Sequence, residues 1–462
     1  MTLQTYKQDQ PIISQYKSAS VIGLGVTGYS AVRYLRARGL SVSVLDSRTE
    51  PLLASKLSEE FPEVDCHFGE FDSANLENAS LIVSSPGVSL KEPVLRTAKA
   101  NGALIVGDVE LFLQENQQPV IAITGSNGKS TVTKLVGEMC VSGGLSPWVA
   151  GNIGQPVLDV FSGENSYDVA VLELSSFQLE TTLNVAADSA AILNVSADHM
   201  DRYDSMGDYV LAKARILRGT KRAVLPRHDE QLKQITNNVS DSLNFDLDEP
   251  SSESEFGVKR QSNNRWLMRG DERLIKLQDI PLIGLHNVKN VLSAFALVDF
   301  LNLPMADLVS AVKSFNGLAH RMQTVVEKNG VTWVNDSKAT NIGATSTALT
   351  NLENNVFWIA GGEGKGADFT ELKNAINSNV KQLILIGRDA PEIAAALDGS
   401  LPIVMAKNMQ EAVTKAGELA TQDSIVLLSP ACASFDMYQN FEKRGDDFVA
   451  CVKRYISGGV NE

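Results

Sequence analysis

The chain contains little cysteine and no long run of apolar residues. Its four cysteines, Cys66, Cys140, Cys432 and Cys451, lie far apart and form no Cys-x-x-Cys pair. A disulfide framework and a cysteine zinc site are therefore not expected, and a reducing compartment fits this composition. No apolar run reaches the roughly 20 residues that span a bilayer, and the first residues, MTLQTYKQDQP, lack the apolar centre of a secretion signal. We expect a cytoplasmic protein that is not inserted in a membrane.

Positive charge is also scarce. Lysine and arginine number 41 against 55 acidic residues, so the net charge is -14 at pH 7. A negative surface disfavours bulk binding to nucleic acid or to an anionic membrane, although a few local cations can still bind an anionic small molecule. The length of 462 residues allows two to four domains, and the apolar content of 44% supplies their cores.

The two ends of the chain carry different α/β patterns. Near the start, an apolar strand at Ser18–Ile22 enters a glycine turn, helical spacing follows at Tyr29–Gly39, and Ser41–Asp46 forms a second strand, which is a β-α-β pattern. Further strand ends are predicted at Ser80–Val88 and Ala103–Glu110. From about residue 315 strands and helices alternate as in a doubly wound parallel sheet. The strand candidates there are residues 331–336, 356–362, 381–387, 401–406 and 424–430.

A middle segment begins after a linker at Gln117–Pro119. Strands are predicted at residues 120–123, Val169–Ser175 and Ala190–Ser196, and a helix at His286–Leu301. The part from Arg222 to Asp279 is polar and rich in serine and asparagine. Its short alternating runs are compatible with an antiparallel patch and loops.

The strongest chemical motif is the segment GSNGKST, which lies between an apolar strand and a helix. Glycines let backbone N–H groups turn toward phosphate oxygens, and the helix N-terminus adds partial positive charge. Lys129 would reach the outer phosphates, and Ser130 or Thr131 would hold Mg²⁺. The loop is two residues shorter than the usual GxxxxGK[ST], and a plain strand-to-helix turn is the alternative. The candidate residues are Gly125, Ser126, Asn127, Gly128, Lys129, Ser130 and Thr131.

Three further residues are candidates for metal chemistry. Glu173 ends the strand VAVLE, and a carboxylate at the end of a neighbouring strand can complete a Mg²⁺ site. His199 follows another strand, and Lys213 lies on a predicted helix. Spacing alone favours a structural role for this histidine and a solvent-facing position for this lysine.

The glycine turn GLGVTG at residues 23–28 has the GxGxxG form, and Asp46 ends the next strand. This matches the dinucleotide fingerprint and, taken alone, would suggest an NAD-dependent dehydrogenase. A turn without a ligand, or a site for another nucleotide whose base or ribose meets Asp46, are the alternatives. The separate phosphate loop makes a simple dehydrogenase less favoured, and a phosphate-loop switch protein without ligase chemistry is another reading.

Three polar loops follow strands of the last segment. They are NDSKATN (residues 335–341), GGEGKGADF (361–369) and SPACASFD (429–436). Strand ends of this kind bind ligands in α/β sheets. A polar helix cap, a simple turn and helix capping by Ser434 are the respective alternatives.

Taken together, these motifs resemble those of the Mur ligases, closest to the members that add D-glutamate. The phosphate loop is shared with folylpolyglutamate synthases, but the glycine turn with Asp46 argues against that branch. The DNPR-type signature of the relatives that add diaminopimelate or lysine is absent. The more specific segments, in order over nearly the whole chain, are ELSSFQLE, LNVSADHMDRY, HRMQ, NDSKATN, LLSPACASFD and NFEKRGDDF.

The resemblance implies an α/β protein of three domains. Residues 1–107 would form a Rossmann-like UDP-substrate domain, residues 108–318 a central phosphate-loop ATPase-like domain with a mostly parallel sheet, and residues 319–462 a Rossmann-like, doubly wound amino-acid domain. The implied reaction joins D-glutamate to UDP-N-acetylmuramoyl-L-alanine through an acyl phosphate, in the synthesis of peptidoglycan precursors. It would use ATP and two Mg²⁺ ions, and we expect a monomer.

The resemblance also implies site residues by motif match. ATP would be bound by the phosphate-loop residues 125–131 with Asn290, His320, Arg321 and Asp336. Lys129, Glu173, His199 and Lys213 would be catalytic. The metal ligands would be Ser130, Glu173, His199 and Lys213, the last carbamylated as in the family, which turns an ammonium into an oxygen ligand. The UDP-substrate would be bound by Val26, Thr27, Asp46, Ser47, Arg48, Gly87, Asn152, Ser175, Gln178 and His199. D-Glutamate would be bound by Lys338, Thr340, Lys365, Ser434, Phe435 and Phe441.

Overall fold

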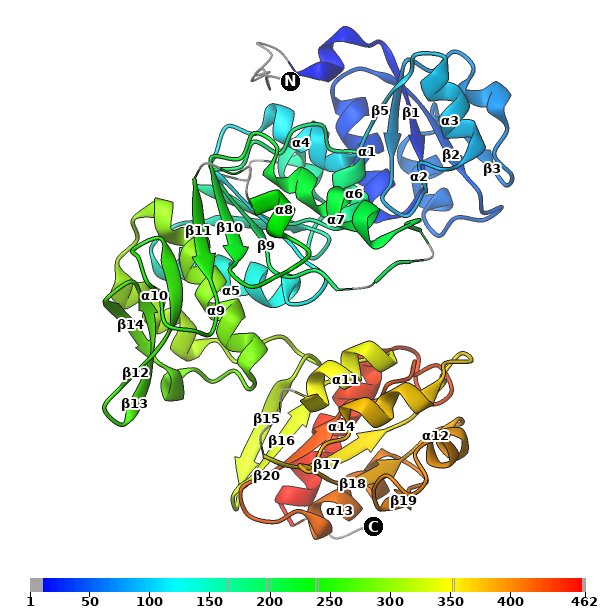
Figure 1. Cartoon of the computed structure of the whole chain (residues 1–462). Coiled ribbons are helices and arrows are strands. Elements are labelled where there is room, and N and C mark those ends of the chain that lie inside the picture. Colours follow the sequence, from blue (N-terminus) through cyan, green and yellow to red (C-terminus); the bar gives the residue numbers. More distant parts are fainter. Residues whose placement is uncertain are drawn as a thin grey trace. The chain divides into compact units, whose positions relative to one another are not determined.

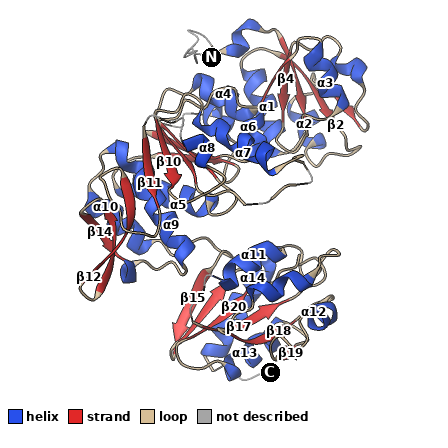
Figure 2. Ribbon diagram, in the orientation of Figure 1, coloured by secondary structure: helices blue, strands red, loops and turns tan. Residues whose placement is uncertain are grey.

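The computed structural model describes residues 11–458, apart from 164–165, 197, 201, 237–238, 240, 351 and 353. The chain divides into two compact units, Met1–Leu277 with Lys289–Val312, and Gln278–Val288 with Lys313–Glu462. The first unit contains two sheets and the second unit contains one, and helices lie beside each of them (Figures 1 and 2). Among the described residues, no helix combines the length and the apolar character needed to cross a membrane.

The first sheet has five parallel strands in the order β3-β2-β1-β4-β5. Its strands are β1 (Ser18–Ile22), β2 (Ser41–Asp46), β3 (Asp65–Phe68), β4 (Leu81–Ser84) and β5 (Leu104–Val106), with helices α1 (Val26–Ala37), α2 (Ala54–Glu60) and α3 (Pro93–Ala100). Val21 and Ile22 of β1 are both fully buried but belong to different apolar clusters. Because side chains alternate along a strand, this sheet is covered on both faces, as parallel sheets are.

The second sheet has nine strands in the order β14-β13-β12-β11-β10-β9-β6-β8-β7. The strands are β6 (Val120–Thr124), β7 (Pro147–Gly151), β8 (Val169–Glu173), β9 (Ser189–Ile192), β10 (Arg222–Pro226), β11 (Ser242–Phe245), β12 (Glu255–Gln261), β13 (Asn264–Arg269) and β14 (Glu272–Lys276). The helices that follow β5 and accompany this sheet are α4 (Asp108–Glu115), α5 (Lys129–Ser142), α6 (Ser176–Glu180), α7 (Met206–Ala214), α8 (Lys233–Thr236), α9 (Leu285–Val298) and α10 (Met305–Ser314). Among the described residues of this sheet, only the pairs β12–β13 and β13–β14 are antiparallel.

The third sheet has six strands in the order β15-β16-β20-β17-β18-β19, and β15 is its antiparallel edge. Its strands are β15 (Gln323–Lys328), β16 (Val331–Asn335), β17 (Asn355–Ala360), β18 (Val380–Leu385), β19 (Ile403–Met405) and β20 (Ser424–Leu428); its helices are α11 (Ile342–Thr350), α12 (Ala390–Ala396), α13 (Met409–Leu419) and α14 (Phe441–Ile456). Trp333 and Val334 are neighbours in β16 but pack in separate cores, one with α13 and α14 and the other with α11 and α12. The doubly wound prediction is therefore confirmed.

Short 3₁₀ helices complete the described structure. They are η1 (Ile12–Gln15), η2 (Ser73–Leu76), η3 (Val157–Ser162), η4 (Arg215–Leu217), η5 (Leu277–Asp279), η6 (Asp299–Leu301) and η7 (Phe369–Ala375).

Three predicted segments contain the expected strands, which are shorter than the segments themselves. The strand predicted at Ala103–Glu110 ends at Val106, because Gly107 begins a helix whose first turn carries two acidic residues, a favourable place for negative charge. The strand predicted at Ser80–Val88 ends before Pro86, which has no N–H for a strand ladder. Within Arg222–Asp279 the antiparallel patch comprises only β12 to β14, since β10 and β11 pair in parallel with their neighbours.

The third sheet offers a test of backbone packing at Gly361. Its φ is +115°, and a Cβ atom there would lie 1.9 Å from the Ile386 carbonyl oxygen. Gly399 has a φ of +71° with nothing within 4 Å of its Cβ position. Gly361→Ala should therefore lower the free energy of unfolding by roughly 2 to 4 kcal/mol more than Gly399→Ala, which costs only about 1–2 kcal/mol of backbone strain. Urea unfolding of the full-length variants measures the difference, and equal midpoints would contradict it.

Candidate functional site

The loop at residues 125–128 is held by residues that follow strand β9. Ser126 N donates to the Asn194 carbonyl at 3.0 Å, and Asn127 N donates to Asn194 Oδ1 at 2.9 Å. The Ser126 hydroxyl donates to the Ser196 carbonyl at 2.9 Å. Because β6 and β9 are parallel neighbours, both segments leave the sheet at the same edge. The predicted phosphate loop therefore stands between the end of β6 and the start of α5.

Gly128 brings helix α9 against this loop. Its φ is +84°, and a Cβ atom there would lie 2.5 Å from the Asn290 side-chain oxygen. Glycine tolerates both the left-handed backbone and the close approach. Two residues predicted to bind the nucleotide, from distant parts of the sequence, thus lie in contact within the first unit.

Two lysine ammonium groups meet at one backbone carbonyl. Lys129 Nζ donates to the Gly125 carbonyl at 2.9 Å and to the Ser126 carbonyl at 3.1 Å, and Lys213 Nζ on α7 donates to the same Gly125 carbonyl at 2.9 Å. Lys213 is 1% exposed. Burial, and then the charge of Lys129, lowers the pKa of Lys213 to about 7. Near neutral pH this lysine is therefore often an uncharged, nucleophilic amine.

Glu173 presents a carboxylate oxygen without a hydrogen-bond donor. It ends β8 opposite Ile123 of β6, so it lies at the same sheet edge as the phosphate loop. The side chain is buried, and its Oε1 accepts from Asn152 Nδ2 at 2.8 Å. Its Oε2 accepts no hydrogen bond from the described residues. A buried oxygen of this kind is costly unless it is paired, so the arrangement fits an oxygen-seeking cation.

A pocket of about 530 Å³ adjoins the glycine turn after β1, and we call it the glycine-turn pocket. Its lining includes every residue predicted to bind the UDP-substrate except Ser175 and His199: Val26, Thr27, Asp46, Ser47, Arg48, Gly87, Asn152 and Gln178. The other lining residues were not predicted to bind the UDP-substrate, although Gly23 and Gly25 belong to the predicted glycine fingerprint: Gly23, Gly25, Phe71, Ser85, Pro86, Val88, Gly151, Gly154 and Pro156. Apart from the two fingerprint glycines, most of these residues are glycine, proline or serine, whose small side chains give little chemical signal in a sequence.

Asp46 and Arg48 form a fixed polar pair in this pocket. Arg48 Nε donates to Asp46 Oδ1 at 2.8 Å, and Leu24 N donates to Asp46 Oδ2 at 2.6 Å. Burial would raise the pKa of the Asp46 carboxyl, but these hydrogen bonds outweigh it and hold that pKa below its ordinary value. Asp46 is therefore an anion at neutral pH, able to accept hydrogen bonds.

Ser175 and His199 lie on the α6 side of the first unit. Ser175 is the N-cap of α6: its hydroxyl accepts from Gln178 N at 3.2 Å, while Gln178 Oε1 accepts from Ser175 N at 3.0 Å. The His199 ring lies 4.8 Å from the Phe177 ring, and its backbone has a φ of +56°. A positive φ is uncommon outside glycine and often marks a functional position.

In the second unit, the predicted adenosine residues gather around the end of β16. Burial raises the pKa of the Asp336 carboxyl to about 7, although it accepts from Ser429 Oγ at 2.9 Å and from Met322 N at 3.2 Å. His320 is buried, and its Nδ1 lies 3.1 Å from Asn335 Nδ2. Arg321 is exposed beside it. Asn290 belongs to the first unit, so a shared nucleotide remains a prediction.

The residues predicted to bind D-glutamate follow strands β16, β17 and β20, with Phe441 at the start of α14. Lys338 Nζ lies 3.9 Å from the centroid of the Phe441 ring, and Lys365 Nζ lies 5.1 Å from that of Phe435. Burial lowers the pKa of Lys338, and Arg321 adds to the effect. Thr340 is half-buried and Ser434 is buried in the same loops. Two lysines in neighbouring loops suit a ligand with two carboxylates.

Sequence reasoning did not find Arg444, which joins two of these loops. The side chain is 1% exposed. Its Nε and Nη2 donate to the Ser337 hydroxyl and carbonyl at 3.0 and 2.9 Å, and its Nη1 donates to the Ala433 carbonyl at 3.2 Å. Tyr209 was also missed, and its hydroxyl lies 3.2 Å from the Ser126 hydroxyl. Tyr209 precedes Lys213 by one helical turn, a spacing that could have pointed to it.

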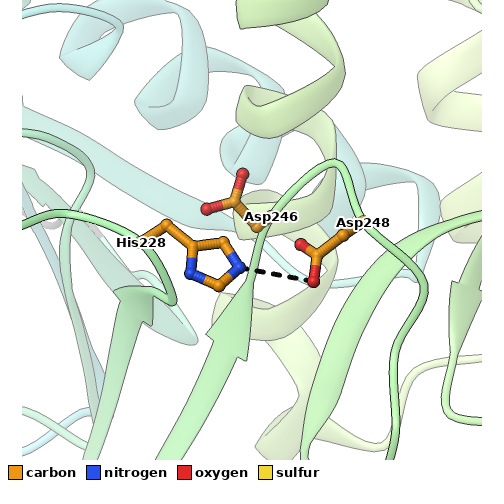
Figure 3. Close-up of side chains that lie close together, drawn as sticks. All are labelled: His228, Asp246 and Asp248. Carbon is orange, nitrogen blue, oxygen red and sulfur yellow. Dashed lines mark hydrogen bonds and ion pairs between the residues drawn. The ribbon is translucent and has the colours of Figure 1, made fainter.

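A group of side chains outside the predicted sites has metal-like spacing. Ligand atoms of His228, Asp246 and Asp248 all lie within 4.8 Å of one another (Figure 3). Asp246 Oδ1 pairs with Lys289 Nζ at 2.6 Å, and Asp248 Oδ1 with Arg227 Nη2 at 2.7 Å. The other oxygen of Asp246 is buried without a donor among the described residues. Two cations already balance both carboxylates, so we interpret the group as an ion-pair network.

Comparison with protein families matches most of the chain in three consecutive parts. Residues 17–107 match the model of the Mur ligase MurD-like N-terminal domain. Residues 123–298 match that of the Mur ligase middle domain, and residues 320–432 that of the Mur ligase glutamate ligase domain.

Curated relatives align over almost their full length. The UDP-N-acetylmuramoylalanine--D-glutamate ligase of Nitrosococcus oceani is 43% identical over 452 residues, 97% of this chain and 99% of that protein. The protein of the same name from Methylobacillus flagellatus is 46% identical, covering 94% of this chain and 96% of its own. That of Pseudomonas aeruginosa is 44% identical, covering 94% and 97%.

Solved structures share the fold at low identity. The UDP-N-acetylmuramate-alanine ligase MurC of Thermotoga maritima has a TM-score of 0.56 at 18% identity, covering 96% of this chain and 99% of that chain. A UDP-N-acetylmuramoyl-L-alanyl-D-glutamate--2,6-diaminopimelate ligase has a TM-score of 0.56 at 19% identity, covering 84% and 94%. The predicted α/β class with three domains and mostly parallel sheets is confirmed.

Asp336 generates a pH-dependent prediction. Its pKa is about 7 in the folded chain against 3.8 for the ordinary carboxyl, so between these pH values the folded state holds a proton that the unfolded state has released. The free energy of unfolding should therefore fall as pH rises from about 4 to about 7, by up to about 4 kcal/mol. Asp336→Asn cannot titrate, so its stability relative to the parent protein should improve across this window.

Urea unfolding of the second unit at pH 5 and pH 8 measures this effect. Asp398→Asn, an exposed carboxylate of the same unit, is the matched control and should follow the parent protein. Identical pH dependence in the parent protein and Asp336→Asn would refute the prediction.

Proposed function

The chain belongs to the Mur ligase family, and from this membership we propose that it joins D-glutamate to UDP-N-acetylmuramoyl-L-alanine at the expense of ATP. The observation that carries the proposal is identity of 43 to 46% to three D-glutamate ligases across at least 94% of the chain. The glutamate ligase domain model at residues 320–432 supports the same amino acid. The product would be a precursor of peptidoglycan.

The proposed chemistry begins with phosphoryl transfer to a carboxylate. A carboxylate is a poor acyl donor, and its acyl phosphate is a good one. The amine of D-glutamate then attacks the acyl carbon, an amide forms and phosphate leaves. Negative charge grows on the transferring group and on the tetrahedral intermediate, so Lys129 in the phosphate loop is positioned to stabilise both.

We propose that Ser130 and Glu173 hold one Mg²⁺, and His199 and Lys213 a second. Bound Mg²⁺ would neutralise the charge of the phosphates and the intermediate. The unpartnered Oε2 of Glu173, at the sheet edge that also carries the phosphate loop, supports the first assignment. Asn152 donates to the other oxygen of Glu173 and would orient it.

We further propose that Lys213 is carbamylated. Its uncharged amine would attack the carbon of CO₂, a C–N bond would form, and a proton would be released to give an anionic carbamate. The arrangement at the Gly125 carbonyl supports this step, because it places Lys213 beside the positive charge of Lys129. A carbamate replaces repulsion between two cations with attraction, and it supplies oxygen ligands.

The remaining site residues are proposed by function. The residues that line the glycine-turn pocket would bind the UDP-substrate, with Ser175 and His199 near its reacting end. Asn290, His320, Arg321 and Asp336 would bind the adenosine of ATP. Lys338 and Lys365 would bind the carboxylates of D-glutamate, and Thr340, Ser434, Phe435 and Phe441 would surround it. The two lysine–aromatic pairs support this assignment.

Boundaries at 107/108 and 318/319, a cytoplasmic location and a monomeric state complete the proposal. Strand β5 ends at Val106 and strand β15 starts at Gln323, which fits these boundaries. The cysteines are all unpaired, which fits a reducing compartment.

Release of phosphate from ATP tests the proposed activity. With UDP-N-acetylmuramoyl-L-alanine and Mg²⁺, release should require D-glutamate and should be absent with L-glutamate, L-alanine or meso-diaminopimelate. Lys129→Ala should lower kcat by about 100-fold or more, because it removes a cation from the reacting phosphate. Lys134→Ala is the matched control, since Lys134 is exposed on the same helix and should leave kcat unchanged. Release with a different amino acid would overturn the assigned specificity.

A separate measurement tests the carbamate. The full-length protein in ¹³C-bicarbonate should show a carbamate carbon signal by NMR that weakens below about pH 7, where Lys213 becomes protonated. Lys213→Arg should lack the signal and lose about 100-fold or more in kcat, whereas Lys134→Arg should keep both. An unchanged signal in Lys213→Arg would assign the carbamate to another amine.

A further inference from the structure

One wall of the glycine-turn pocket is the short segment Ser85–Val88, which follows β4. Its first residue is fixed to the glycine turn, because the Ser85 hydroxyl donates to the Gly23 carbonyl at 2.7 Å and Ser85 N donates to the Ile22 carbonyl at 2.9 Å. Pro86 and Gly87 come next, and neither has a side chain that can anchor the wall through a hydrogen bond. Val88 N donates to the Ser85 carbonyl at 3.0 Å, which closes the segment as a turn, and the carbonyls of Pro86 and Val88 meet a partner from elsewhere in the chain.

Arg202 is that partner, and it comes from the loop that carries His199. Its Nη1 donates to the Pro86 carbonyl at 3.1 Å, and its Nη2 donates to the Val88 carbonyl at 3.3 Å. These two carbonyls flank Gly87. The Arg202 side chain is only 12% exposed, so the hydrogen bonds are shielded from water.

The guanidinium of Arg202 is itself held in place by helix α6. Glu180, the last residue of α6, accepts from Arg202 Nη2 at 2.9 Å through one oxygen and from the Tyr203 hydroxyl at 2.6 Å through the other. The guanidinium also lies 4.0 Å from the centroid of the Phe177 ring. The Phe177 ring also contacts the His199 ring, with 4.8 Å between the centroids and a tilt of 57°. Arg202, Phe177 and His199 thus form a continuous series of contacts from the pocket wall to a proposed metal ligand.

We propose that Arg202 is a positioning residue that sets the distance between the pocket wall at Pro86–Val88 and His199. The inference rests on the proposed function, because the pocket must hold a UDP-substrate whose carboxylate reaches the groups around His199. A substrate that binds between the wall and His199 would be aligned for reaction only while Arg202 keeps the wall and His199 at a fixed distance. Loss of Arg202 should weaken binding of the UDP-substrate and slow the chemical step, without changing the amino-acid site in the second unit.

The geometry requires arginine rather than any cation. The two terminal nitrogens of the planar guanidinium reach different carbonyls while one of them also meets Glu180. A lysine could pair with Glu180 but presents one nitrogen in place of this fork. Arg202→Lys therefore preserves the charge and much of the packing while it removes the bridge to the wall.

An exposed ion pair joins nearly the same two segments as the Arg202 hydrogen bonds and supplies a matched control. Lys91 Nζ lies 2.8 Å from Asp204 Oδ1, and these side chains are 57% and 83% exposed. Exposed pairs contribute little because water screens them. Lys91→Ala should therefore leave binding and turnover within about twofold of the parent protein.

The test measures the dissociation constant of UDP-N-acetylmuramoyl-L-alanine by titration calorimetry, with kcat and the KM values of all three substrates. Arg202→Ala and Arg202→Lys should each raise the dissociation constant and the KM of the UDP-substrate about tenfold and lower kcat about tenfold. The KM of D-glutamate should stay within twofold. A role in stability alone would not separate one substrate from another in this way.

The outcomes distinguish this inference from the proposed function. A parent protein that binds and turns over the UDP-substrate, with Arg202→Lys indistinguishable from it, would overturn the positioning role and leave the function intact. Equal increases in all three KM values would also overturn it, since the wall contacts only one substrate. A parent protein that neither binds nor turns over the UDP-substrate would overturn both.

Discussion

The chemistry of the first unit depends on the meeting of Lys129 and Lys213 at the carbonyl oxygen of Gly125. Two ammonium groups on one acceptor repel each other, and burial of Lys213 removes the water that would screen them. The arrangement is tolerable when one group loses its charge or becomes an anion. The phosphate loop, the end of β6 and helix α7 all meet at this carbonyl. The repulsion between the two ammonium groups therefore lies where phosphoryl transfer is proposed.

The residues around Lys129 and Lys213 come from the ends of several neighbouring strands. The loop after β9 holds the phosphate loop, and Glu173 at the end of β8 presents an unpaired oxygen beside it. Asn152, which follows β7, donates to Glu173 and also lines the glycine-turn pocket. One amide side chain therefore connects the proposed metal ligand with the proposed UDP-substrate, and parallel strands make this connection short because their carboxyl ends share one edge.

Sequence reasoning predicted the parts of this fold that depend on local pattern. The alternation of apolar strands and helices predicted the third sheet, and the glycine loop before Lys129 predicted a strand-to-helix turn, both as the structure has them. It did not separate the two kinds of pairing within Arg222–Asp279, because strand pairing is long-range: β10 and β11 extend the parallel sheet, and β12 to β14 form the antiparallel patch. Arg202 and Arg444 were missed for the same reason, since their acceptors are backbone carbonyls more than ten residues away.

All residues proposed for D-glutamate lie between positions 338 and 441, in one unit and in one uninterrupted stretch of chain, whereas the glycine-turn pocket lies wholly in the other unit. This separation has an evolutionary consequence. Amino-acid choice can diverge through changes confined to the last third of a gene, while recognition of the nucleotide sugar is inherited intact.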